Sequence, residues 1–425
     1  MSFTEALRYL DRHVNLEARA GYFEDLSLQS MEKLMELSGD PQHAFRSIHV
    51  TGTNGKGSTA TMIARLLMAQ GLRVGRYSSP HLSSITERIE IDGEPVPRDL
   101  FAEEVLALAA VAELSEYPAS YFELLTATAY RIFAAEAVEV AVIEVGVLGR
   151  FDATNVIESD IAVVTNIGTD HTDQQGDWRR KIAEEKVGIS NPTSTLVVGE
   201  TDTEIRDVFE DAIAASTLFA EQDFELVLDQ PAVGGRLIDI RTPRGLYEDV
   251  FLSVHGSHQA TNAAVALTAA EEFFEAALPD EVVAEAFGEL KLPGRVEVVG
   301  KEPTVVLDGA HNPEAAEALS ITLATAFSGG SPRIFVLAVL EPRDPAEFIE
   351  EVGIGQGDYV VATPVNSPRS ISAERIAEAA TTAGAIAETA SDAEGALDRA
   401  RTLAGVDGLV VVTGSLYVVG EARDA

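Results

Sequence analysis

The sequence predicts a two-domain α/β protein, with a larger N-terminal domain built on a doubly wound, mostly parallel sheet and a smaller C-terminal α/β domain. The chain has 425 residues, which is more than one hydrophobic core usually serves. Near-continuous apolar runs at 138–146 and 160–168 are typical of parallel strands covered on both faces. Beyond residue 294 a second series of apolar runs alternates with helical stretches, so we place the domains at 1–297 and 298–425.

The first domain is predicted to begin with a helix, followed by a strand, a glycine-rich turn and a second helix. Residues 46–50 form a short apolar run, and a turn at 52–58 precedes apolar residues at helical spacing. This order is that of phosphate-binding loops in doubly wound sheets. Further along we expect a strand at 72–78 and a hairpin at 87–96 that turns at Asp92-Gly93. Two helices are expected after it, at 98–114 and 121–136.

Residues 224–254 alternate in polarity and contain Gly-Gly and Pro-Arg-Gly turns, which predicts a small antiparallel sheet before a helix that begins near Ser257. The C-terminal series is Rossmann-like, because short apolar strands alternate with helices rich in Ala and Glu. Its strands are predicted at TVVLD, RIFVLAVL, DYVVATPV and GLVVVTG, which begin at residues 304, 333, 358 and 408.

The charge of the chain limits its partners. A formal net charge of −38 would repel nucleic acid and anionic membranes, so we expect small-molecule substrates and a monomeric protein. The basic residues are six Lys and 25 Arg. A Lys-poor, acidic surface is typical of a halophile's protein, since molar salt screens charge repulsion to about 3 Å. A disordered acidic chain is not expected, because 46% of the residues are hydrophobic.

The compartment is also predicted from composition. No apolar run approaches the roughly 20 residues of a membrane span, and the first residues, MSFTEALRYLDRH, lack the core of a signal peptide. The chain contains no Cys, so nothing requires an oxidising compartment. We therefore expect a cytoplasmic protein.

The segment Gly52-Thr53-Asn54-Gly55-Lys56-Gly57-Ser58 is the strongest candidate for a nucleotide site. Backbone N–H groups of such a turn and the N-terminus of the next helix can bind phosphates, while Lys56 reaches the outer ones. The spacing departs from a standard Walker A motif, since Val50 stands in place of a glycine and Gly57 in place of a hydroxyl residue. A glycine-rich turn without a ligand is the alternative.

Three more side chains follow or accompany the buried strands of the first domain. Glu144 closes an apolar run, and the carboxyl end of a parallel strand is where such sheets hold a nucleotide-bound metal. His171 lies just beyond the next run, where a hydrogen-bonded loop residue is the alternative to a metal ligand. Lys186 lies in a helical segment, where the alternative is an ion pair along the helix.

In the second domain, Asp308 and His311 follow a predicted strand and precede a helix, so they are candidates to face a ligand. A helix entry with Pro at the first position would explain Asn312-Pro313 alone, but it would not require a histidine.

The chain contains, in order, HVTGTNGKGS, YSSPHLSSITERIEIDG, SYFELLTA, VIEVGVLGRFDATN, VVTNIGTDHTD, EEKVGI, HGSHQATNAA, LPGRVE, LDGAHNP and VTGSLY. Together these motifs resemble the dihydrofolate synthase/folylpolyglutamate synthase family, whose relatives are the Mur ligases of cell-wall synthesis. The resemblance extends from about residue 5 to the C-terminus.

The resemblance implies roles for particular residues. The residues implied to bind ATP are Gly52, Thr53, Asn54, Gly55, Lys56, Gly57, Ser58, Asn262, Arg295 and Asp308. The implied metal ligands are Ser79, Glu144 and His171. The residues implied to face the pterin are Ser120, Tyr121, Phe122, Glu123, Phe151, Asp152 and Ala153. Lys186 matches a carbamylated lysine of the family, and the residues that match its glutamate-binding positions are His311, Arg369 and Ser415, with His311 also placed in catalysis.

The reaction that the resemblance implies is ATP-dependent ligation of L-glutamate to dihydropteroate, to folate (tetrahydrofolate), or to both, through an acyl phosphate. Its cofactors are ATP and Mg²⁺, with K⁺ as a further candidate. Mg²⁺ and Lys56 would spread charge during phosphoryl transfer, and a closed two-domain cleft would exclude water. The chain departs from the family at Leu148, in a usual glycine position, and at Arg343, where a lysine is usual.

Two other classes remain as alternatives. A Mur-type peptide ligase would use the same nucleotide chemistry, but we would expect a UDP-sugar-binding domain before the phosphate loop, and 51 residues precede Gly52. A non-catalytic, ATP-responsive binding protein would require neither a histidine in the second domain nor metal ligands.

Overall fold

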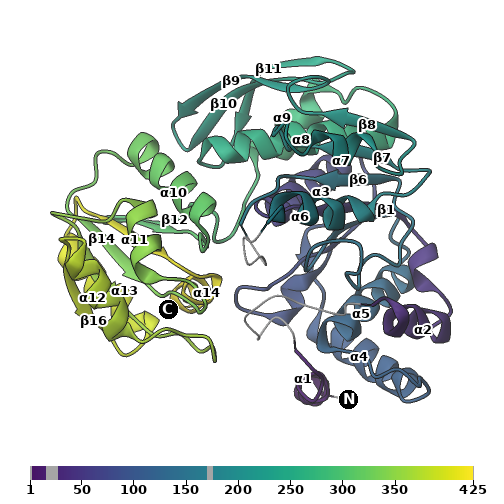
Figure 1. The fold of residues 1–425 in the computed structure, drawn as a ribbon, viewed down its shortest axis with the longest axis horizontal. Coiled ribbons are helices and arrows are strands. Elements are labelled where there is room, and N and C mark those ends of the chain that lie inside the picture. Colours follow the sequence, from purple (N-terminus) through teal and green to yellow (C-terminus); the bar gives the residue numbers. More distant parts are fainter. Residues whose placement is uncertain (1, 16–26, 170–175, 425) are drawn as a thin grey trace. The chain divides into compact units, whose positions relative to one another are not determined.

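The computed structural model describes residues 2–15, 27–169 and 176–424, which form two compact units (Figure 1). The first unit consists of Met1–Asp229, Ile238–Leu252 and Ala260–Leu290. The second consists of Gln230–Leu237, Ser253–Gln259 and Lys291–Ala425. Each unit combines a parallel-rich sheet with helices, so the predicted α/β class is confirmed.

Eight strands form the central sheet of the first unit. They are β1 (Arg46–Thr51), β2 (Val74–Tyr77), β3 (Ile89–Ile91), β4 (Glu94–Pro95), β5 (Val140–Glu144), β6 (Ile161–Val164), β7 (Thr195–Val198) and β8 (Ser216–Phe219). Their order is β4-β3-β2-β5-β1-β6-β7-β8. The pairs β2–β3 and β3–β4 are antiparallel, and all other neighbours are parallel. The chain leaves β1 toward β2 on one side and later crosses from β5 to β6 on the other. Ligands bind at the carboxyl ends of the strands beside such a switch point.

Helices cover this sheet in two hydrophobic clusters. The helices of the first unit are α1 (Phe3–Leu10), α2 (Gln29–Leu37), η1 (Pro41–His43), α3 (Lys56–Ala69), η2 (Ile85–Arg88), α4 (Arg98–Ala112), α5 (Tyr121–Ala135), α6 (Trp178–Lys186), η3 (Val187–Ile189), α7 (Arg206–Glu210) and α9 (Asp280–Gly288). In one cluster α1, α2, α4 and α5 bury Leu10, Met31, Phe101 and Phe133. In the other, α6 and α7 pack on β6 and β7. Both clusters include side chains of the central strands, from whose ends the loops of the site begin.

A separate three-stranded sheet occupies the region where an antiparallel patch is predicted. Its strands are β9 (Glu225–Ala232), β10 (Gly235–Arg241) and β11 (Leu246–Leu252), in the order β11-β10-β9. Helix α8 (Ser257–Phe274) follows, and it begins at the predicted residue.

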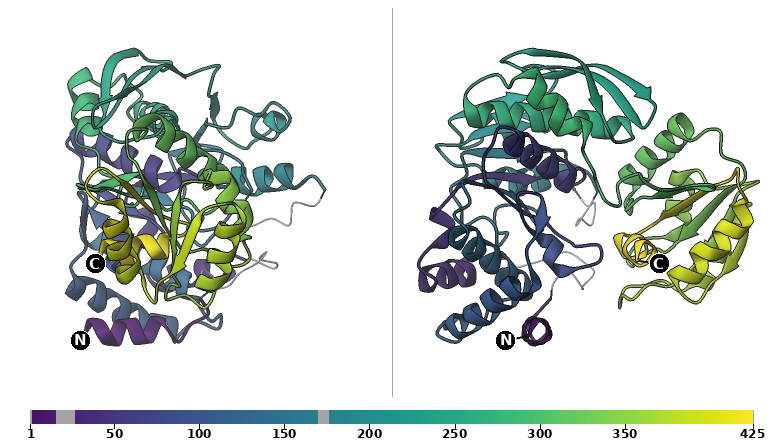
Figure 2. Two further views of the ribbon diagram at one scale, coloured as in Figure 1. Left: turned by 90° about the vertical axis from the view of Figure 1, so that its left-hand side faces the viewer. Right: turned by 180° about the vertical axis from the view of Figure 1, so that it is seen from behind.

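The second unit has its own six-stranded sheet (Figures 1 and 2). Its strands are β12 (Glu297–Lys301), β13 (Thr304–Leu307), β14 (Arg333–Leu337), β15 (Tyr359–Ala362), β16 (Ile386–Thr389) and β17 (Leu409–Thr413), in the order β12-β13-β17-β14-β15-β16. All neighbours are parallel except β12 and β13. The helices are α10 (Pro313–Ala326), α11 (Pro345–Val352), α12 (Ala373–Thr382), α13 (Ala393–Ala404) and α14 (Leu416–Arg423).

Four strands of the two larger sheets are absent from the sequence prediction. Three of them, β8, β12 and β16, lie at sheet edges. They have exposed or half-exposed side chains, such as Ile386 at 58% exposure, and therefore lack a continuous apolar run. The fourth, β7, is buried but only four residues long, and a short apolar run does not identify a strand by its periodicity.

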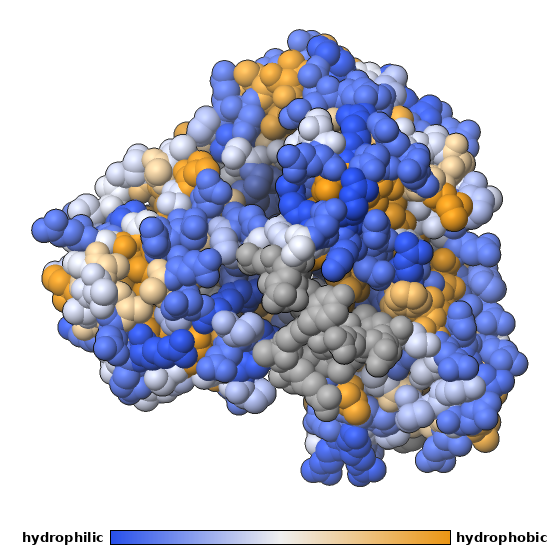
Figure 3. All heavy atoms as spheres, in the orientation of Figure 1, coloured by the Kyte–Doolittle hydropathy of each residue, from blue (hydrophilic) through white to orange (hydrophobic). Residues whose placement is uncertain are grey.

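The surface in view is mainly hydrophilic, with hydrophobic residues in small separate groups (Figure 3). None of the helices within residues 2–15, 27–169 and 176–424 has the length and hydrophobicity to cross a lipid bilayer.

Candidate active site

The predicted phosphate-binding turn joins β1 to α3 at the centre of the first sheet. Gly52 has a φ of 147° and Gly55, the N-cap of α3, has a φ of 81°, both in the range that favours glycine. A Cβ at Gly52 would lie 1.8 Å from Oγ1 of Thr165, so the Thr165 side chain leaves no room for a side chain at residue 52. The first N–H groups of α3, up to the buried Ser58, have no partner within the helix, and such helix ends bind anions.

Two lysine side chains converge on the carbonyl oxygen of Gly52. The Nζ of Lys56 donates to this oxygen at 3.0 Å and to the carbonyl oxygen of Thr53 at 3.1 Å. Lys186, the last residue of α6, is 5% exposed, and its Nζ donates to the Gly52 carbonyl at 2.7 Å. The fold thus brings together two lysines that lie far apart in the sequence and that are both candidate site residues from the sequence.

Glu144, the last residue of β5, lies beside the same turn. Its Oε2 accepts a hydrogen bond from the backbone N–H of Ser79 at 3.2 Å. A Cβ at Gly57 would lie 3.3 Å from this oxygen, so glycine there leaves the carboxylate its space. A side chain at residue 57, such as the hydroxyl residue of a Walker A motif, would require the Glu144 carboxylate to move by a few tenths of an ångström.

Two of the three predicted metal ligands, Ser79 and Glu144, are therefore neighbours, while His171 lies outside the described residues. Carboxylate and hydroxyl oxygens fit the preference of Mg²⁺ for hard ligands. In the part of the chain that the structure describes, no group of three or more His, Cys, Asp or Glu side chains is arranged to bind a metal.

The predicted pterin-facing residues of α5 have defined structural contacts. Ser120 and Glu123 form a capping box: the Glu123 N–H donates to Oγ of Ser120 at 3.2 Å, and the Ser120 N–H donates to Oε2 of Glu123 at 2.6 Å. Tyr121 is buried at 7% exposure. The ring of Phe122 packs against Gly146, where a Cβ would lie 2.5 Å from the ring. Of these four side chains, the ring of Phe122 is directed toward the loop that follows β5.

That loop contains the other predicted pterin contacts. Asp152 is buried and accepts hydrogen bonds from the N–H groups of Val147 and Thr154, at 2.8 and 3.0 Å. Burial raises the pKa of the Asp152 carboxyl, although these hydrogen bonds oppose the rise. Ala153 is buried, whereas Phe151 is 43% exposed. Asp152 therefore shapes the loop, and Phe151 offers an accessible ring.

Asn262, on the second turn of α8, lies against the phosphate turn. It is 6% exposed, and its Oδ1 would be 2.5 Å from a Cβ at Gly55. The absence of a side chain at Gly55 thus allows the Asn262 amide to approach the N-terminus of α3.

In the second unit, Asp308 directly follows β13 and is buried at 7% exposure. Its carboxylate accepts from the N–H groups of Val296 and Ala310, both at 2.8 Å. Burial raises the pKa of Asp308, and the neighbouring Arg295 opposes that rise. An Nη1 atom of Arg295 would lie 3.0 Å from a Cβ at Gly309, so the guanidinium lies beside the residue that follows Asp308.

The three residues predicted to meet glutamate follow strands of the second sheet. His311, whose Nδ1 lies 2.8 Å from the Gly309 carbonyl oxygen, comes after β13. Arg369, after β15, donates from Nε to the carbonyl oxygen of Glu341 at 2.9 Å. Ser415, after β17, caps α14 by accepting from the Val418 N–H at 3.3 Å. Because parallel strands end at the same edge of a sheet, all three residues belong to one edge of the second unit.

Sequence reasoning did not single out three further residues. Thr165 and Asn166, just after β6, hold Asn54 of the turn: the Thr165 hydroxyl and the Asn166 amide donate to the Asn54 carbonyl at 2.6 and 3.0 Å.

His258 is beside Arg295 and Arg236, and burial lowers its pKa to about 4. Among the described residues its Nδ1 has no hydrogen-bond partner. The motifs VVTNIGTDHTD and HGSHQATNAA contain all three, but the spacing alone does not show which side chains face the site.

Comparison with known proteins agrees with this geometry. Residues 50–270 match the Mur ligase middle domain, and residues 294–416 match the Mur ligase glutamate ligase domain. The dihydrofolate synthase/folylpolyglutamate synthase of Mycobacterium tuberculosis is 37% identical, over 94% of this chain and 90% of that protein. The chain belongs to the dihydrofolate synthase/folylpolyglutamate synthase family. It is accordingly an ATP-dependent acid–amino-acid ligase, and the predicted enzyme class is confirmed.

Solved structures of family members have the same fold. A folylpolyglutamate synthase of Mycobacterium tuberculosis complexed with ADP has a TM-score of 0.91 at 35% identity, covering 99% of this chain and 97% of that one. A bifunctional folylpolyglutamate synthase/dihydrofolate synthase of Yersinia pestis, complexed with AMPPNP and Mn ion, has a TM-score of 0.85 at 30% identity, covering 100% and 98%. Both of these family members thus bind a nucleotide, and one of them binds a divalent metal as well.

One family member is a longer protein. A probable bifunctional folylpolyglutamate synthase/dihydropteroate synthase of Haloferax volcanii is 32% identical over 100% of this chain, which spans 50% of that protein.

Proposed function

We propose that this ligase joins L-glutamate to dihydropteroate, to tetrahydrofolate, or to both, through an acyl phosphate. The observation that supports this most strongly is the convergence of Lys56 and Lys186 on the Gly52 carbonyl, next to the Glu144 carboxylate. Such a site can bind a polyphosphate at a helix N-terminus and provides both a cation and a carboxylate at its outer end.

The proposed chemistry has two steps. In the first, an oxygen of the substrate carboxylate attacks the γ-phosphorus of ATP, the bond to the bridging oxygen breaks, and an acyl phosphate and ADP form. In the second, the amine of glutamate attacks the acyl carbon, phosphate leaves with the bonding electrons, and the amine loses a proton. The ammonium of Lys56 would stabilise negative charge on the transferred phosphoryl group.

Metal ions complete this proposal, with Mg²⁺ as the expected divalent ion and the monovalent K⁺ as a further candidate. Ser79, Glu144 and His171 would hold the Mg²⁺, which would neutralise charge on the phosphates. We propose that Lys186 is carbamylated, which would replace an ammonium by a carboxylate beside the turn. Its burial at 5% exposure fits a residue that acts inside the site rather than on the surface.

The substrates are assigned to two regions of the chain. We assign the pterin to the segments around Phe122 and Phe151, because aromatic rings stack on flat heterocycles and the Phe151 ring is accessible. We assign glutamate to the C-terminal domain, 298–425, where His311, Arg369 and Ser415 lie at one edge of the sheet. The N-terminal domain, 1–297, would bind ATP.

We further propose that the protein works as a cytoplasmic monomer at high salt. The net charge of −38 and the mainly hydrophilic surface in view support this proposal. Acidic surfaces repel themselves at low ionic strength, and molar salt screens that repulsion.

Glutamate-dependent ADP release in molar KCl with Mg²⁺ tests the proposal, with dihydropteroate and tetrahydrofolate assayed in parallel. Turnover with both acceptors would establish a bifunctional enzyme, and turnover with one would identify the reaction. Trapping with hydroxylamine should yield a hydroxamate of the pteridine substrate if an acyl phosphate forms. ADP release that does not depend on any carboxylate acceptor would contradict the proposal, and Lys56→Ala provides the inactive control.

A further inference from the structure

We propose that Arg179 and Glu200 are positioning residues that hold the phosphate-binding turn in the shape that binds ATP. The inference rests on the proposed function in one respect, since it takes 52–58 as the turn that holds the phosphates. Neither residue belongs to that turn, and both act through the segment that follows β6.

The turn is attached to this segment by a close set of hydrogen bonds. The Thr53 hydroxyl accepts from the Gly168 N–H at 2.9 Å and lies 3.3 Å from the Gly168 carbonyl oxygen, while the Thr53 N–H donates to the Asn166 carbonyl at 3.0 Å. The Asn54 N–H donates to Oδ1 of Asn166 at 2.9 Å, and the Asn166 amide returns a bond to the Asn54 carbonyl at 3.0 Å. The position of residues 166–168 therefore determines the position of residues 53 and 54.

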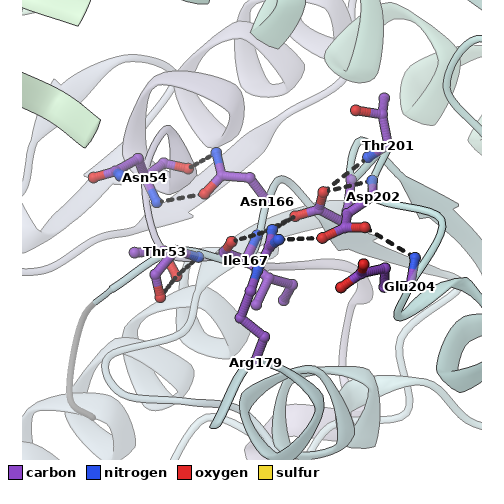
Figure 4. A network of polar contacts seen from close by, with 10 residues as sticks. Thr53, Asn54, Asn166, Ile167, Arg179, Thr201, Asp202 and Glu204 are labelled. Carbon is purple, nitrogen blue, oxygen red and sulfur yellow. Dashed lines mark hydrogen bonds and ion pairs between the residues drawn. The ribbon is translucent and has the colours of Figure 1, made fainter. Parts of the chain in front are cut away.

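Arg179 and Glu200 both bind this segment at Ile167. Figure 4 shows Arg179 and Ile167 within the network of polar contacts that includes Thr53, Asn54 and Asn166. Oε2 of Glu200 accepts from the Ile167 N–H at 2.7 Å, and Nη2 of Arg179 donates to the Ile167 carbonyl at 3.0 Å. The N–H group of Ile167 is thus bound by the Glu200 carboxylate, and its carbonyl oxygen is bound by the Arg179 guanidinium. The same Arg179 nitrogen lies 3.5 Å from Oε2 of Glu200, so the three groups form a closed set.

The pair is itself anchored. Oε1 of Glu200 accepts from the N–H groups of Thr201 and Asp202, at 3.0 and 2.8 Å, and Nη1 of Arg179 is paired with the Asp202 carboxylate. The Glu200 side chain is only 8% exposed. A buried carboxylate of this kind depends on its partners, because loss of one leaves uncompensated charge in a poorly solvated place.

The consequence for the site is a change of nucleotide affinity rather than of fold. Without Arg179, the Glu200 and Asp202 carboxylates lose the cation between them and the Ile167 carbonyl loses its donor. We expect residues 166–168 to shift, and the turn at Thr53 and Asn54 to shift with them. Phosphate binding depends on the directions of several backbone N–H groups, so a small displacement weakens several contacts at once.

The neighbouring Arg180 provides a matched control. It lies on the same helix, and its side chain is 31% exposed against 36% for Arg179. It forms a bidentate ion pair with Asp207, at 2.7 and 2.8 Å. None of its described contacts reaches the segment at 166–168. Arg179→Met and Arg180→Met therefore each remove a guanidinium and its ion pairs from the same helix, but only the contacts of Arg179 reach the segment that holds the turn.

The test is calorimetric titration of the folded variants with ADP, which needs no folate substrate, together with the KM values for ATP and for the pteridine substrate. We expect Arg179→Met and Glu200→Ala each to raise the Kd for ADP and the KM for ATP about tenfold or more. The KM for the pteridine and the Arg180→Met values should stay within about twofold of wild type. The double variant Arg179→Met/Glu200→Ala should bind ADP no more weakly than the weaker single variant, because both substitutions break one unit.

The inference is overturned if both single variants, folded by circular dichroism, bind ADP within twofold of wild type. Lys56→Ala separates this failure from a failure of the proposed function. If Lys56→Ala loses ADP binding while Arg179→Met keeps it, the positioning role alone is wrong. If Lys56→Ala binds ADP as wild type does, the turn is not the phosphate site and both proposals are wrong.

Discussion

The Nζ atom of Lys186 lies 2.7 Å from the carbonyl oxygen of Gly52, a contact that joins the end of α6 to the start of the phosphate-binding turn. The lysine side chain is buried, so this contact is shielded from water. Ion pairing on the surface of α6, the alternative considered from the sequence, does not account for such a position.

Lys186→Met is expected to reduce the rate of ligation at least about a hundredfold while leaving the secondary structure intact. The substitution removes the Nζ group, and with it the proposed carbamate, from the site. Lys181→Met, five residues earlier on the same helix and exposed, should retain wild-type activity. ADP release measures both. Peptide mass spectrometry of the wild type in bicarbonate should find a carbamate on Lys186, and a bare amine at that position would remove the carbamylation proposal.

Phe151→Ala is expected to raise the KM for the pteridine substrate about tenfold, since the 43% exposed ring is proposed to stack on the pterin. The KM for ATP should not change. Leu114→Ala, which truncates another exposed apolar side chain at 73% exposure, is the control. Equal KM values for Phe151→Ala and wild type would show that the pterin binds elsewhere.

The buried Glu271 is expected to make stability depend on pH. Burial raises the pKa of its carboxyl, although hydrogen bonds from Thr242 and Tyr247 oppose the rise. A raised pKa in the folded state means that protonated Glu271 is favoured by folding. The stabilisation that protonated Glu271 gives the folded state is therefore complete below the unfolded pKa of about 4.3. It is lost as pH rises through the pKa of the folded state.

Urea unfolding of wild type and Glu271→Gln between pH 4 and pH 7 measures this effect. The stability of the variant relative to wild type should increase as pH rises, because glutamine does not ionise. The adjacent Glu272→Gln, which removes an ion pair with Arg244 at 2.8 Å, should show no such increase. A difference between Glu271→Gln and wild type that is constant across this range would contradict the assignment.

Dilution of KCl from molar concentration to about 0.1 M is expected to unfold the protein, because the Debye length grows from about 3 to about 10 Å and the net charge of −38 is then poorly screened. Circular dichroism at constant protein concentration follows the transition. Sucrose at low salt is the control, since it favours the compact state without screening charge. An unchanged spectrum down to 0.1 M would remove the argument for a high-salt habitat.

Much of the fold could be predicted because its central strands are unusually apolar. The positions of Glu144 and Asp308 follow from such runs, since each residue ends or follows a strand whose neighbours are buried. The pairing of Asn54 with Asn166 could not be predicted, because it joins residues 112 positions apart whose types occur in many loops. Ser120 and Glu123 show a different limit: the spacing S-x-x-E is itself a capping box, and a resemblance to a family does not separate that role from contact with a substrate.

Helix α6 makes two of the contacts on which the phosphate turn depends. Arg179 near its start binds the Ile167 carbonyl and Lys186 at its end binds the Gly52 carbonyl. The two residues are seven positions apart, which is close to two full turns and about 10 Å along the axis, so both project from one side of the helix. The length of the helix therefore sets the distance between these two contacts. Substitutions on its outer side should be tolerated, whereas inserting or deleting one residue would rotate Lys186 by about 100° away from the turn. Evolution of this ligase would therefore have to preserve the number of residues between Arg179 and Lys186, whereas the other residues of α6 could change more freely.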